Sequence, residues 1–548
     1  MTMPSVRCFM THSPFEGLLK GVLSAAAEAS PSSSSSMDEF QELVVQSGER
    51  EPEARSASRL ELTVEEAIEQ HVGSLGFAQL VHVFLVSLAW MFDAQNTLIT
   101  IFSDAQPAWR CTPSSSSSAS CSSSSSSDGM CGLDRGAWEW VGGNKTSIIA
   151  EWGLVCDRRF RAGIPASFFF LGSLFGSAVH GRLADSYLGR KKTVFLSCLL
   201  TSMTAFLTSL APNIWVYALL RFSNGFARSG IGICCLVLAT ETVGRKWRGQ
   251  VGQYGFFFFT IGFLSLPLIS YPARTSWRTI YKVISLLPLA YSILIIPFVS
   301  ESPRWLAVKG RTGEALDVLT KFAKLNGNKL PGNLAISNTI DTNAGSATKP
   351  ESLWSARWAT RRIATIMVAG FVVGFVYYGF QLNVENLNFN LYFTVGVNAL
   401  MEIPAVFIGS VFLSFANRRT LFSSSAFVAG VSCILCILFT KKPTTRGGNF
   451  AQLSAESVGF MAASMVFDIL YVYCVELFPT NVRNLAVSKL RQSLMLGAAI
   501  APHLVTLGRL NPWISFLIFG GLSIFGGLMT IWLPETRNAP VCETLEQQ

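Results

Sequence analysis

The chain has 548 residues, of which 50% are hydrophobic and only 14% are charged. Soluble domains carry about 25% charged residues, so this composition excludes an ordinary soluble protein and predicts a chain that uses lipid as part of its solvent. The net charge of +9 lies in short loops between apolar segments. Because no basic stripe is interleaved with aromatic residues, the charge does not indicate a nucleic-acid-binding protein.

The N-terminal region, residues 1–72, is polar and rich in Ser, including the run from Ser32 to Ser36. Such a segment buries too little apolar surface to fold, and we predict a disordered cytosolic tail. A targeting peptide is the alternative, but the first part of this region is not strongly charged. Residues 64–76 have the pattern of a short amphipathic helix on the membrane surface.

Twelve apolar stretches follow, each about 20 residues long and able to cross the ~30 Å hydrocarbon core of a bilayer. They lie at about 78–102, 161–183, 193–211, 214–239, 249–271, 280–300, 363–383, 389–414, 421–440, 455–478, 485–508 and 513–533. They predict an all-α membrane protein with two bundles of six helices. The predicted parts are the tail 1–72, an N-terminal bundle 73–300 that includes an extracytoplasmic loop 103–160, a cytoplasmic central loop 301–362, a C-terminal bundle 363–537 and a cytosolic tail 538–548.

The loop 103–160 is long and rich in Ser, and it carries a set of cysteines. These are Cys111, Cys121, Cys131 and Cys156. Four cysteines outside the cytosol predict two disulfides, and the spacing leaves three pairings open. The sequon that begins at Asn144 predicts glycosylation on the same side of the membrane.

Basic residues gather in the loops on one side of the predicted bundles. They include Arg190-Lys191-Lys192, the stretch from Arg245 to Arg248, and Arg418-Arg419. Cytoplasmic loops carry an excess of Lys and Arg, so this side is assigned to the cytosol. Both termini are then expected in the cytosol, and the cysteine-bearing loop outside it.

The two halves repeat charged residues at a nearly constant offset. Glu241 and Glu476 follow the fourth and tenth stretches at an offset of 235 (476 − 241). Glu301 and Glu535 follow the sixth and twelfth at 234 (535 − 301). Anchoring at the membrane interface would explain where these charges lie but not their common spacing. Parallel six-helix repeats predict a substrate site between the halves, near the middle of the membrane.

Several of these motifs resemble those of the major facilitator superfamily. The loop after the second stretch, from Gly181 to Lys191, resembles the superfamily's loop signature with one extra residue before Gly189. Further matches are Trp90 to Thr97, Arg221 to Gly225, Glu301 to Leu306, Tyr377 to Gly379, Glu402 to Ala405, Glu476 to Thr480 and Pro534 to Arg537. In combination they are similar to the organic cation/carnitine transporter family, and most similar to its plant members, over residues 64–545.

The resemblance implies a gating role for charged residues at the cytoplasmic edge. They are Asp185, Arg190, Glu241, Arg248, Glu476 and Arg483. Ion pairs there can close one state of an alternating transporter and separate in the other, which needs a coupling of only a few kcal/mol. Static pairing at helix ends is the alternative.

Ionisable residues inside the predicted spans mark a pathway more often than a packing position. The candidates are Asp93, Arg221, Arg228, Asp468, Lys489 and Arg491. Asp93 and Asp468 have two interpretations: either could hold a substrate ammonium group, or could pair with Arg221 or Arg491. Arg491 lies one turn before Met495, which occupies the position where the family's cation carriers have an acid. A positive group there favours a carboxylate-bearing substrate, unless Asp468 balances it.

Aromatic rings are the second component of a site for an organic cation. The candidates are Tyr254, Phe257, Phe258, Tyr377, Tyr378 and Tyr471. Packing and lipid contact are the alternative for most of them, because Phe alone occurs 41 times. The resemblance favours Tyr377 and Tyr378, since it implies a site on the seventh helix.

The sequence therefore predicts a secondary transporter of organic cations or of zwitterions such as carnitine, working by alternating access. An organic anion carrier, a sugar carrier and a non-transporting receptor on this fold are the alternatives. We expect no enzyme activity, no cofactor, no metal site and no ATP-driven pumping, because no nucleophile motif, His cluster or phosphate loop is present. The expected partners are a small organic ion, the lipid bilayer and a coupled proton or sodium ion. The vacuolar and plasma membranes fit equally well.

Overall fold

The computed structural model describes residues 60–112, 129–134, 136–336, 357–387, 389–440 and 446–537. The predictions for 1–59 and 538–548, and part of that for the central loop, lie outside the described residues. The chain divides into two compact units. The described part of the smaller unit is residues 60–61 and 331–335, which contribute to a two-stranded sheet of β1 (Leu60–Leu62) and β4 (Leu334–Ile336). The larger unit holds the helices.

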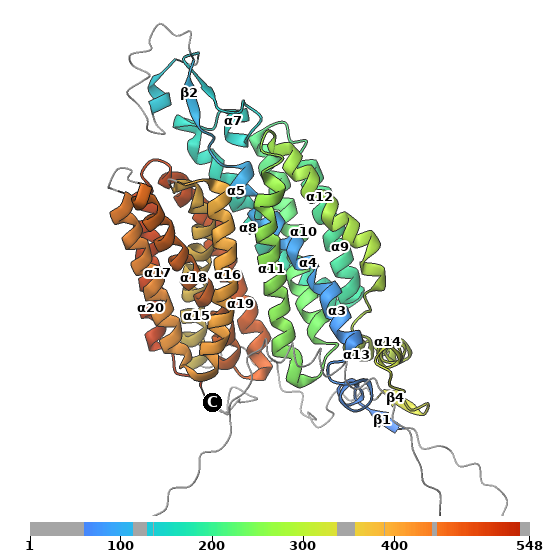
Figure 1. The fold of residues 1–548 in the computed structure, drawn as a ribbon. Helices are drawn as coiled ribbons and strands as arrows, with labels where there is room; N and C mark the ends of the chain where they lie inside the picture. Colours follow the sequence, from blue (N-terminus) through green and yellow to red (C-terminus); the bar gives the residue numbers. More distant parts are fainter. Residues whose placement is uncertain are drawn as a thin grey trace, which may run out of the picture. The chain divides into compact units, whose positions relative to one another are not determined.

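The described part of the larger unit contains one helical span for each of the twelve predicted stretches (Figure 1). In the N-terminal half these are α3 (Phe77–Ser87), α4 (Ala89–Leu98) and α5 (Thr100–Ser103), which together make one span, then α8 (Ile164–Leu183), α9 (Gly189–Thr208), α10 (Ile214–Thr240), α11 (Arg248–Ser270) and α12 (Trp277–Leu294). In the C-terminal half they are α15 (Arg357–Asn383), α16 (Leu391–Phe415), α17 (Arg418–Thr440), α18 (Arg446–Leu477), α19 (Thr480–Gly508) and α20 (Pro512–Met529). The all-α, two-bundle fold class is confirmed.

Length and apolar composition single out 10 helical stretches in the described residues that could cross a membrane. The stretch from Cys156 to Thr208 contains both α8 and α9, so it accounts for two predicted spans. Helix α19 is not among the ten. It carries Arg483, Lys489 and Arg491, whose charges lower its mean hydropathy. A polar helix of this length inside a bundle is expected to face the interior and not lipid.

Glycines bring the helices of each half into close contact. A Cβ on Gly172 of α8 would lie 2.0 Å from the carbonyl oxygen of Phe222 in α10. Gly262 of α11 and Gly497 of α19 have the same role against α4 and α15, and they are 235 positions apart (497 − 262). These glycines therefore allow close approach of the helices, and the offset seen in the charged motifs recurs in the helix contacts.

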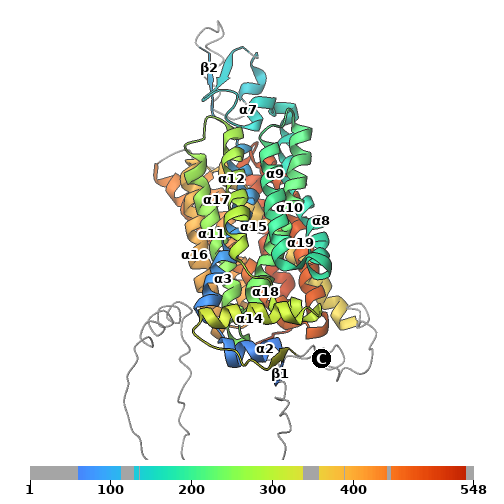
Figure 2. The same ribbon diagram turned by 90° about the vertical axis from the view of Figure 1, so that its right-hand side faces the viewer.

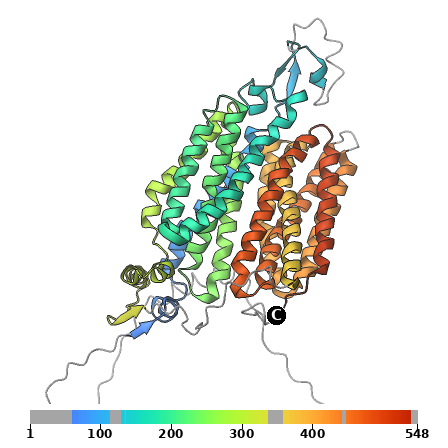
Figure 3. The same ribbon diagram turned by 180° about the vertical axis from the view of Figure 1, so that it is seen from behind.

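The two halves meet along a seam formed by α8 with α19 and by α11 with α16 (Figure 3). Phe170 of α8 packs against Tyr378 of α15, with 4.7 Å between ring centroids. Phe263 of α11 meets Phe460 of α18 at 6.4 Å. These contacts place α15, α18 and α19 of the second half against the first, as expected of a site between repeats.

One end of the bundle, which we call the loop end, carries residues 104–163. There β2 (Trp109–Cys111) pairs antiparallel with β3 (Trp138–Trp140), next to the short helices η2 (Gly129–Gly132), α7 (Ile148–Trp152) and η3 (Cys156–Gly163). Glu151 of α7 accepts hydrogen bonds from Trp277 and Arg278 at the start of α12, which ties the loop to the bundle.

The cysteines and the sequon of this loop are partly described. Cys131 and Cys156 form one disulfide, which resolves part of the open pairing. Cys111 is also disulfide-bonded, and Cys121 lies outside the described residues. Asn144 is exposed, so its side chain is accessible.

The opposite end, which we call the basic end, carries Arg190, Arg248 and Arg418. Here α2 (Val64–Ala67) and η1 (Ile68–Val72) follow a capping box in which Thr63 and Glu66 bond each other's backbone N–H groups. The short helix predicted within 64–76 is thus present over residues 64–72, so the disorder predicted up to residue 72 does not extend over these residues. A cap and the buried side chains Val64, Ala67 and Val72 stabilise this segment.

The central loop is also partly helical. Helices α13 (Pro303–Val308) and α14 (Thr312–Leu325) lie at the basic end of the N-terminal half, and α14 runs across the ends of the spanning helices (Figure 2). Leu319 and Phe322 of α14 are buried, and Phe322 packs edge-on against His82 of α3. An amphipathic helix that buries one stripe explains why a polar, basic sequence is ordered here.

Candidate functional site

A buried ion pair lies in the middle of the N-terminal half. Asp93 of α4 accepts a hydrogen bond from Arg228 of α10 at 2.8 Å, and each side chain is about 95% or more buried. Arg228 also donates to Thr97 at 2.8 Å and to Ser173 at 3.3 Å. Of the two sequence interpretations of Asp93, pairing with Arg is the one observed, but the partner is Arg228 rather than Arg221 or Arg491.

The second half adds a positive group to this pair. The Arg491 guanidinium and the Asp93 carboxylate lie 2.8 Å and 3.8 Å from the position that a Cβ on Gly232 would occupy. Gly232 of α10 therefore leaves the space through which Arg491 of α19 reaches across the seam. Tyr378 interacts electrostatically with all three charges. Two arginines thus lie near one described carboxylate, so the net charge of these three groups at the seam is positive.

A different set of groups lies in the C-terminal half, between α15, α16 and α18. Tyr377 donates a hydrogen bond to Glu402 at 2.5 Å, and both side chains are buried. Asp468 of α18 interacts electrostatically with Glu402 and Tyr377. The rings of Phe460 and Phe467 lie 5.9 Å and 4.7 Å from that of Tyr377. Carboxylates bordered by aromatic faces are the groups that hold organic ammonium ions.

Another carboxylate in this half was not singled out from the sequence. Glu456 of α18 is 1% exposed and accepts a hydrogen bond from Asn398 of α16 at 2.9 Å. Glu402 had been quoted only as part of a family motif. Both could have been found by the rule that located Asp93, because each is an acid within an apolar span.

The remaining candidates fall in different places. Tyr471 interacts electrostatically with Arg491 and Asp468, so it lies between the two sets of charges. Tyr254 is half-buried and packs against the hydrophobic core, and no described contact joins it to these charges. Lys489 bonds its own helix neighbour Gln492.

Arg221 and a carboxylate form a further buried cluster near the loop end. Arg221 is fully buried, donates to the carbonyl of Asn96 and lies 4.2 Å from the ring of Phe169. Asp104, directly after α5, accepts hydrogen bonds from Ser103 at 2.6 Å and from Tyr217 at 2.8 Å. Burial raises the pKa of Asp104 to about 6, against the lowering effect of these donors and of the nearby arginines.

Contacts between the halves close the loop end. Arg509, at the end of α19, pairs with Glu385 of its own half at 2.6 Å and donates to the backbone carbonyl of Asp104 at 2.9 Å. The rings of Phe102 and Tyr392 stack across the seam at 5.2 Å. At the basic end, the described ion pairs each stay within one half. This arrangement has the loop end closed.

The gating candidates Glu241 and Arg248 of the N-terminal half do not pair with each other. Arg190 pairs with Asp185 at 3.1 Å and with Glu241 at 3.5 Å. Arg248 pairs with Glu65 of α2 and not with Glu241. Glu65 also accepts from Arg245 and Arg304, and the hydrogen bond from Arg245 leads the effects that lower its pKa. The N-terminal segment thus holds three arginines of this half together.

The corresponding charges of the C-terminal half follow the same plan. Glu476 pairs with Arg418 at 3.0 Å, whereas Arg483 donates to the carbonyl of Phe478. Arg418, one of the basic residues of the loop after the eighth predicted stretch, has the same place here as Arg190 in the first half. Glu535 bonds the backbone N–H groups of Arg418 and Arg419 at the start of α17, as Glu301 bonds those of Arg190 and Lys191 at the start of α9. The repeat inferred from spacing is therefore present in three dimensions.

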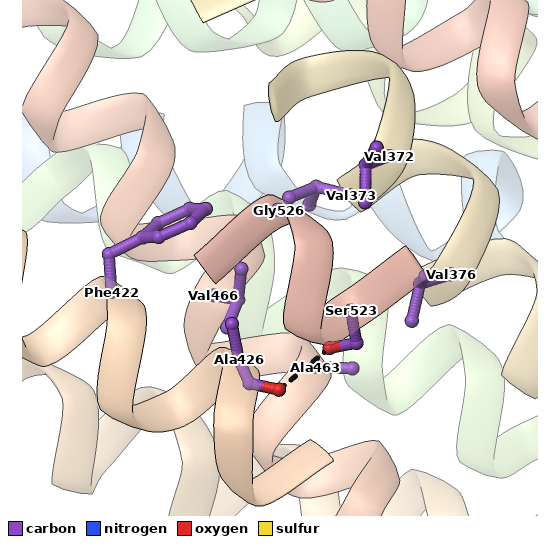
Figure 4. A pocket seen from close by; sticks show the side chains of 9 residues that line it. All are labelled: Val372, Val373, Val376, Phe422, Ala426, Ala463, Val466, Ser523 and Gly526. Carbon is purple, nitrogen blue, oxygen red and sulfur yellow. Dashed lines mark hydrogen bonds between the residues drawn. The ribbon is translucent and has the colours of Figure 1, made fainter. Parts of the chain in front are cut away.

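A small pocket inside the C-terminal half is not a candidate for the substrate. It lies among α15, α17, α18 and α20, and its lining is Val372, Val373, Val376, Phe422, Ala426, Ala463, Val466, Ser523 and Gly526 (Figure 4). The Ser523 hydroxyl is bonded to the carbonyl of Ala426. Because the lining is apolar and its one hydroxyl group is already hydrogen-bonded, this pocket provides no polar contact for an organic ion.

Two six-helix bundles that enclose charges along their seam define a membrane transporter of the major facilitator class. The model of the family "Sugar (and other) transporter" matches residues 107–546. Among curated proteins, organic cation/carnitine transporter 3 of Arabidopsis thaliana is 43% identical over 490 residues, which cover 89% of this chain and 93% of that protein. Organic cation/carnitine transporter 2 of the same plant is 41% identical, with 89% and 94% covered.

Among solved structures, the xylose transporter XylE from E. coli in its inward-open conformation aligns with a TM-score of 0.60 and 13% identity, covering 84% of this chain and 98% of that one. This likeness concerns the fold alone. The chain belongs to the sugar (and other) transporter family, and within it to the group of the plant organic cation/carnitine transporters. The resemblance seen in the sequence motifs is confirmed.

Proposed function

We propose that this protein carries a zwitterion of the carnitine type, with both ends of the substrate recognised. The observation that carries the proposal is the separation of charge across the seam. Arg491 lies near the Asp93–Arg228 ion pair, so the net charge of these three groups is positive. Glu402, by contrast, is bonded to Tyr377, whose ring lies against those of Phe460 and Phe467, and Asp468 interacts electrostatically with Glu402. The substrate carboxylate would bind at Arg491, and its quaternary ammonium at the carboxylates and aromatic faces. The names of the plant relatives agree with this substrate class.

Uptake into proteoliposomes tests this assignment, with labelled carnitine, tetraethylammonium and a hexose compared. Removing a charge-assisted contact costs about 1.5–3 kcal/mol, so Arg491→Gln should raise the KM for carnitine about tenfold or more. The same change should alter the KM for tetraethylammonium by no more than about twofold, because that ion has no carboxylate. Glu402→Gln and Asp468→Asn should weaken both substrates.

Glu314→Gln is the matched control, since Glu314 is exposed on α14 and pairs with Arg311. Equal losses of carnitine and tetraethylammonium uptake in Arg491→Gln would contradict the two-ended site. Preference for an organic anion in the wild type would favour the anion-carrier alternative, and saturable hexose uptake the sugar-carrier alternative.

We further infer coupling to protons rather than to sodium. Glu456 is buried with a single neutral amide partner among the described residues. A carboxyl group in such a place is best kept neutral by a proton, whereas a metal cation would need several oxygen ligands. An inward proton gradient should therefore raise carnitine uptake at constant sodium, and Glu456→Gln should abolish that response. Stimulation by a sodium gradient alone would refute it.

The orientation is proposed from the positive-inside rule, with the basic end in the cytosol and the loop end outside it. The exposed Asn144 supports this orientation. Glycosidase treatment should shift the mobility of the wild type but not of Asn144→Gln. Imaging of a tagged chain decides between the vacuolar and the plasma membrane.

A further inference from the structure

A hollow lined by arginines lies at the basic end of the C-terminal half. Its volume is about 740 Å³. The first turns of α15 contribute Arg357, Arg361 and Arg362, the start of α17 contributes Arg419, and Trp358 and Trp532 border it. Nothing in the transport mechanism uses these residues.

The carboxylates nearby are already committed to other groups. Glu476 is bound by Arg418. Glu535 accepts the backbone N–H groups of Arg418 and Arg419. In the described part of the chain, no carboxylate pairs with Arg357, Arg361, Arg362 or Arg419. The described residues therefore leave the positive charge of the hollow uncompensated.

Arg362 is held in place by an aromatic contact. Its guanidinium lies 4.4 Å from the ring centroid of Trp358. Its Nη1 atom is buried and has no hydrogen-bond partner among the described residues. Leaving such a donor unsatisfied costs free energy, which an anion in the hollow would recover. The N-terminus of α15 adds the positive end of one helix dipole, whereas that of α17 is bonded to Glu535.

The hollow adjoins a surface suited to lipid. Trp532 is 79% exposed, and Leu528 and Ile531 on the same last turns of α20 are 48% and 45% exposed. Large apolar side chains with an interfacial Trp are typical of the boundary between acyl chains and headgroups. A ligand with a phosphate head and acyl tails would contact both the arginines and this surface.

The same corner of the N-terminal half is built differently. There Trp305 of α13 lies over Gly189 and within 6.0 Å of the Arg190 guanidinium. Helix α13 and the helix α14 that follows it are packed together. The first half thus covers the corner with its own chain, whereas the described residues of the second half leave it lined by arginines.

We propose that this hollow binds the phosphorylated headgroup of an anionic membrane lipid, such as a phosphatidylinositol monophosphate. A phosphomonoester carries about −1.5 to −2 charges and three acceptor oxygens, which match planar guanidinium forks. Basic pockets between spanning helices are suited to such headgroups. The site is separate from the seam, and the proposal does not depend on the transported substrate.

Binding to the purified full-length protein tests the proposal. The probes are a short-chain phosphatidylinositol monophosphate, phosphatidylcholine of equal chain length, the free inositol bisphosphate headgroup and inorganic phosphate. The inositol lipid should bind, and Arg357→Gln/Arg361→Gln/Arg419→Gln should weaken it about tenfold or more. The triple Arg→Lys variant should bind between these two, because it keeps the charge and loses the fork.

The triple control Lys309→Gln/Lys324→Gln/Lys329→Gln removes the same charge from exposed lysines of the N-terminal half, and it should bind the lipid as the wild type does. If the triple Arg variant does not fold, each single Arg→Gln variant should still weaken binding severalfold. Equal loss in the lysine control, or equal binding of phosphatidylcholine, would overturn the site. Tighter binding of the free headgroup than of the lipid would overturn the lipid assignment.

Discussion

The two halves of the transporter share a backbone plan but distribute their buried charges differently. In the N-terminal half the described acid Asp93 is paired with Arg228, and Arg221 is satisfied in part by the carbonyl of Asn96. In the C-terminal half the described hydrogen-bond partners of the acids are neutral groups: Tyr377 and Thr260 for Glu402, and Asn398 for Glu456. Duplication preserved the scaffold and left the interior charges free to diverge.

This difference distinguishes buried charges that stabilise the fold from buried charges that are available to bind a ligand. Asp93 and Arg228 form a buried ion pair with a direct hydrogen bond of 2.8 Å, and breaking such a pair is costly. A buried carboxyl group whose partner is neutral can still take up a proton or a cation. On the proposed function, the pair in the N-terminal half stabilises the seam, and the carboxyl groups of the C-terminal half bind the substrate and the proton.

The largest expected effect breaks the pair in the N-terminal half. Arg228→Met removes the ion-pair partner of Asp93, and Arg491, which is near but forms no ion pair with Asp93 among the described residues, does not replace its hydrogen bond. We expect a loss of about 3–5 kcal/mol in the free energy of unfolding. Asp93→Asn/Arg228→Met should recover much of that loss, because neither charge then stays unpaired. Thermal unfolding of the purified protein measures both.

The contrast with the C-terminal half sharpens this test. Glu402→Gln removes a carboxyl group that has no cationic partner among the described residues, so its thermal midpoint should equal or exceed that of the wild type. If Glu402→Gln destabilises as much as Arg228→Met, the two halves do not differ in the proposed way.

A smaller effect is expected at the loop end, where Asp104 of the first half meets Arg509 of the second. Burial raises the pKa of Asp104 from 3.8 to about 6 in the closed arrangement. At 1.36 kcal/mol per pKa unit, closure can be favoured by at most about 3 kcal/mol at acid pH relative to pH 7. The closed arrangement binds the proton more tightly, so closure strengthens as the pH falls below about 6 and weakens above it.

This pH dependence can be followed by labelling a cysteine introduced at Thr506, which is buried at the loop end. The protein with Asp104 should be labelled more slowly at acid pH than at neutral pH, after correction for thiolate reactivity. Asp104→Asn in the same background should remove that difference and slow labelling at neutral pH. A pH response that persists in Asp104→Asn would assign the effect to another group.

The smallest effect concerns the corners where the halves are most alike. Glu301 and Glu535 each cap the first turn of a helix, α9 and α17 respectively. Glu301→Gln and Glu535→Gln should each cost about 1 kcal/mol, as other lost helix caps do. The exposed Glu314→Gln should cost less than either. If only one of these two variants loses stability, the two corners have the same geometry but contribute differently to the free energy of unfolding.

Much of this architecture could be predicted from the sequence because its signals are local or periodic. The twelve apolar stretches predict the spans from α3 to α20, since helix length must match the thickness of the bilayer. The offset between Glu301 and Glu535 predicts two equivalent corners, and both glutamates do cap equivalent helices. The Cys131–Cys156 disulfide lies in the loop that the sequence assigned to the cysteines.

Partner choice could not be predicted in the same way. Asp93 had several arginines within reach of a sequence argument, and only the packing of α4 against α10 selects Arg228. Arg248 and Arg483 were expected among the gating charges of Glu241 and Glu476, yet Arg248 bonds Glu65 and Arg483 a backbone carbonyl. The helix of Glu65 lies 183 residues away in the chain from Arg248, and no local pattern encodes such a contact.

The class of protein, the number of spans, the repeat and the charged residues inside the bundle all follow from the amino-acid sequence. They follow because hydrophobicity, length and spacing can be read directly along the chain. The tertiary structure alone decided which charges pair, which carboxylates keep only neutral partners and which arginines line an open hollow. Those outcomes depend on distances of a few ångströms between helices, and Coulomb and hydrogen-bond energies change steeply over that range.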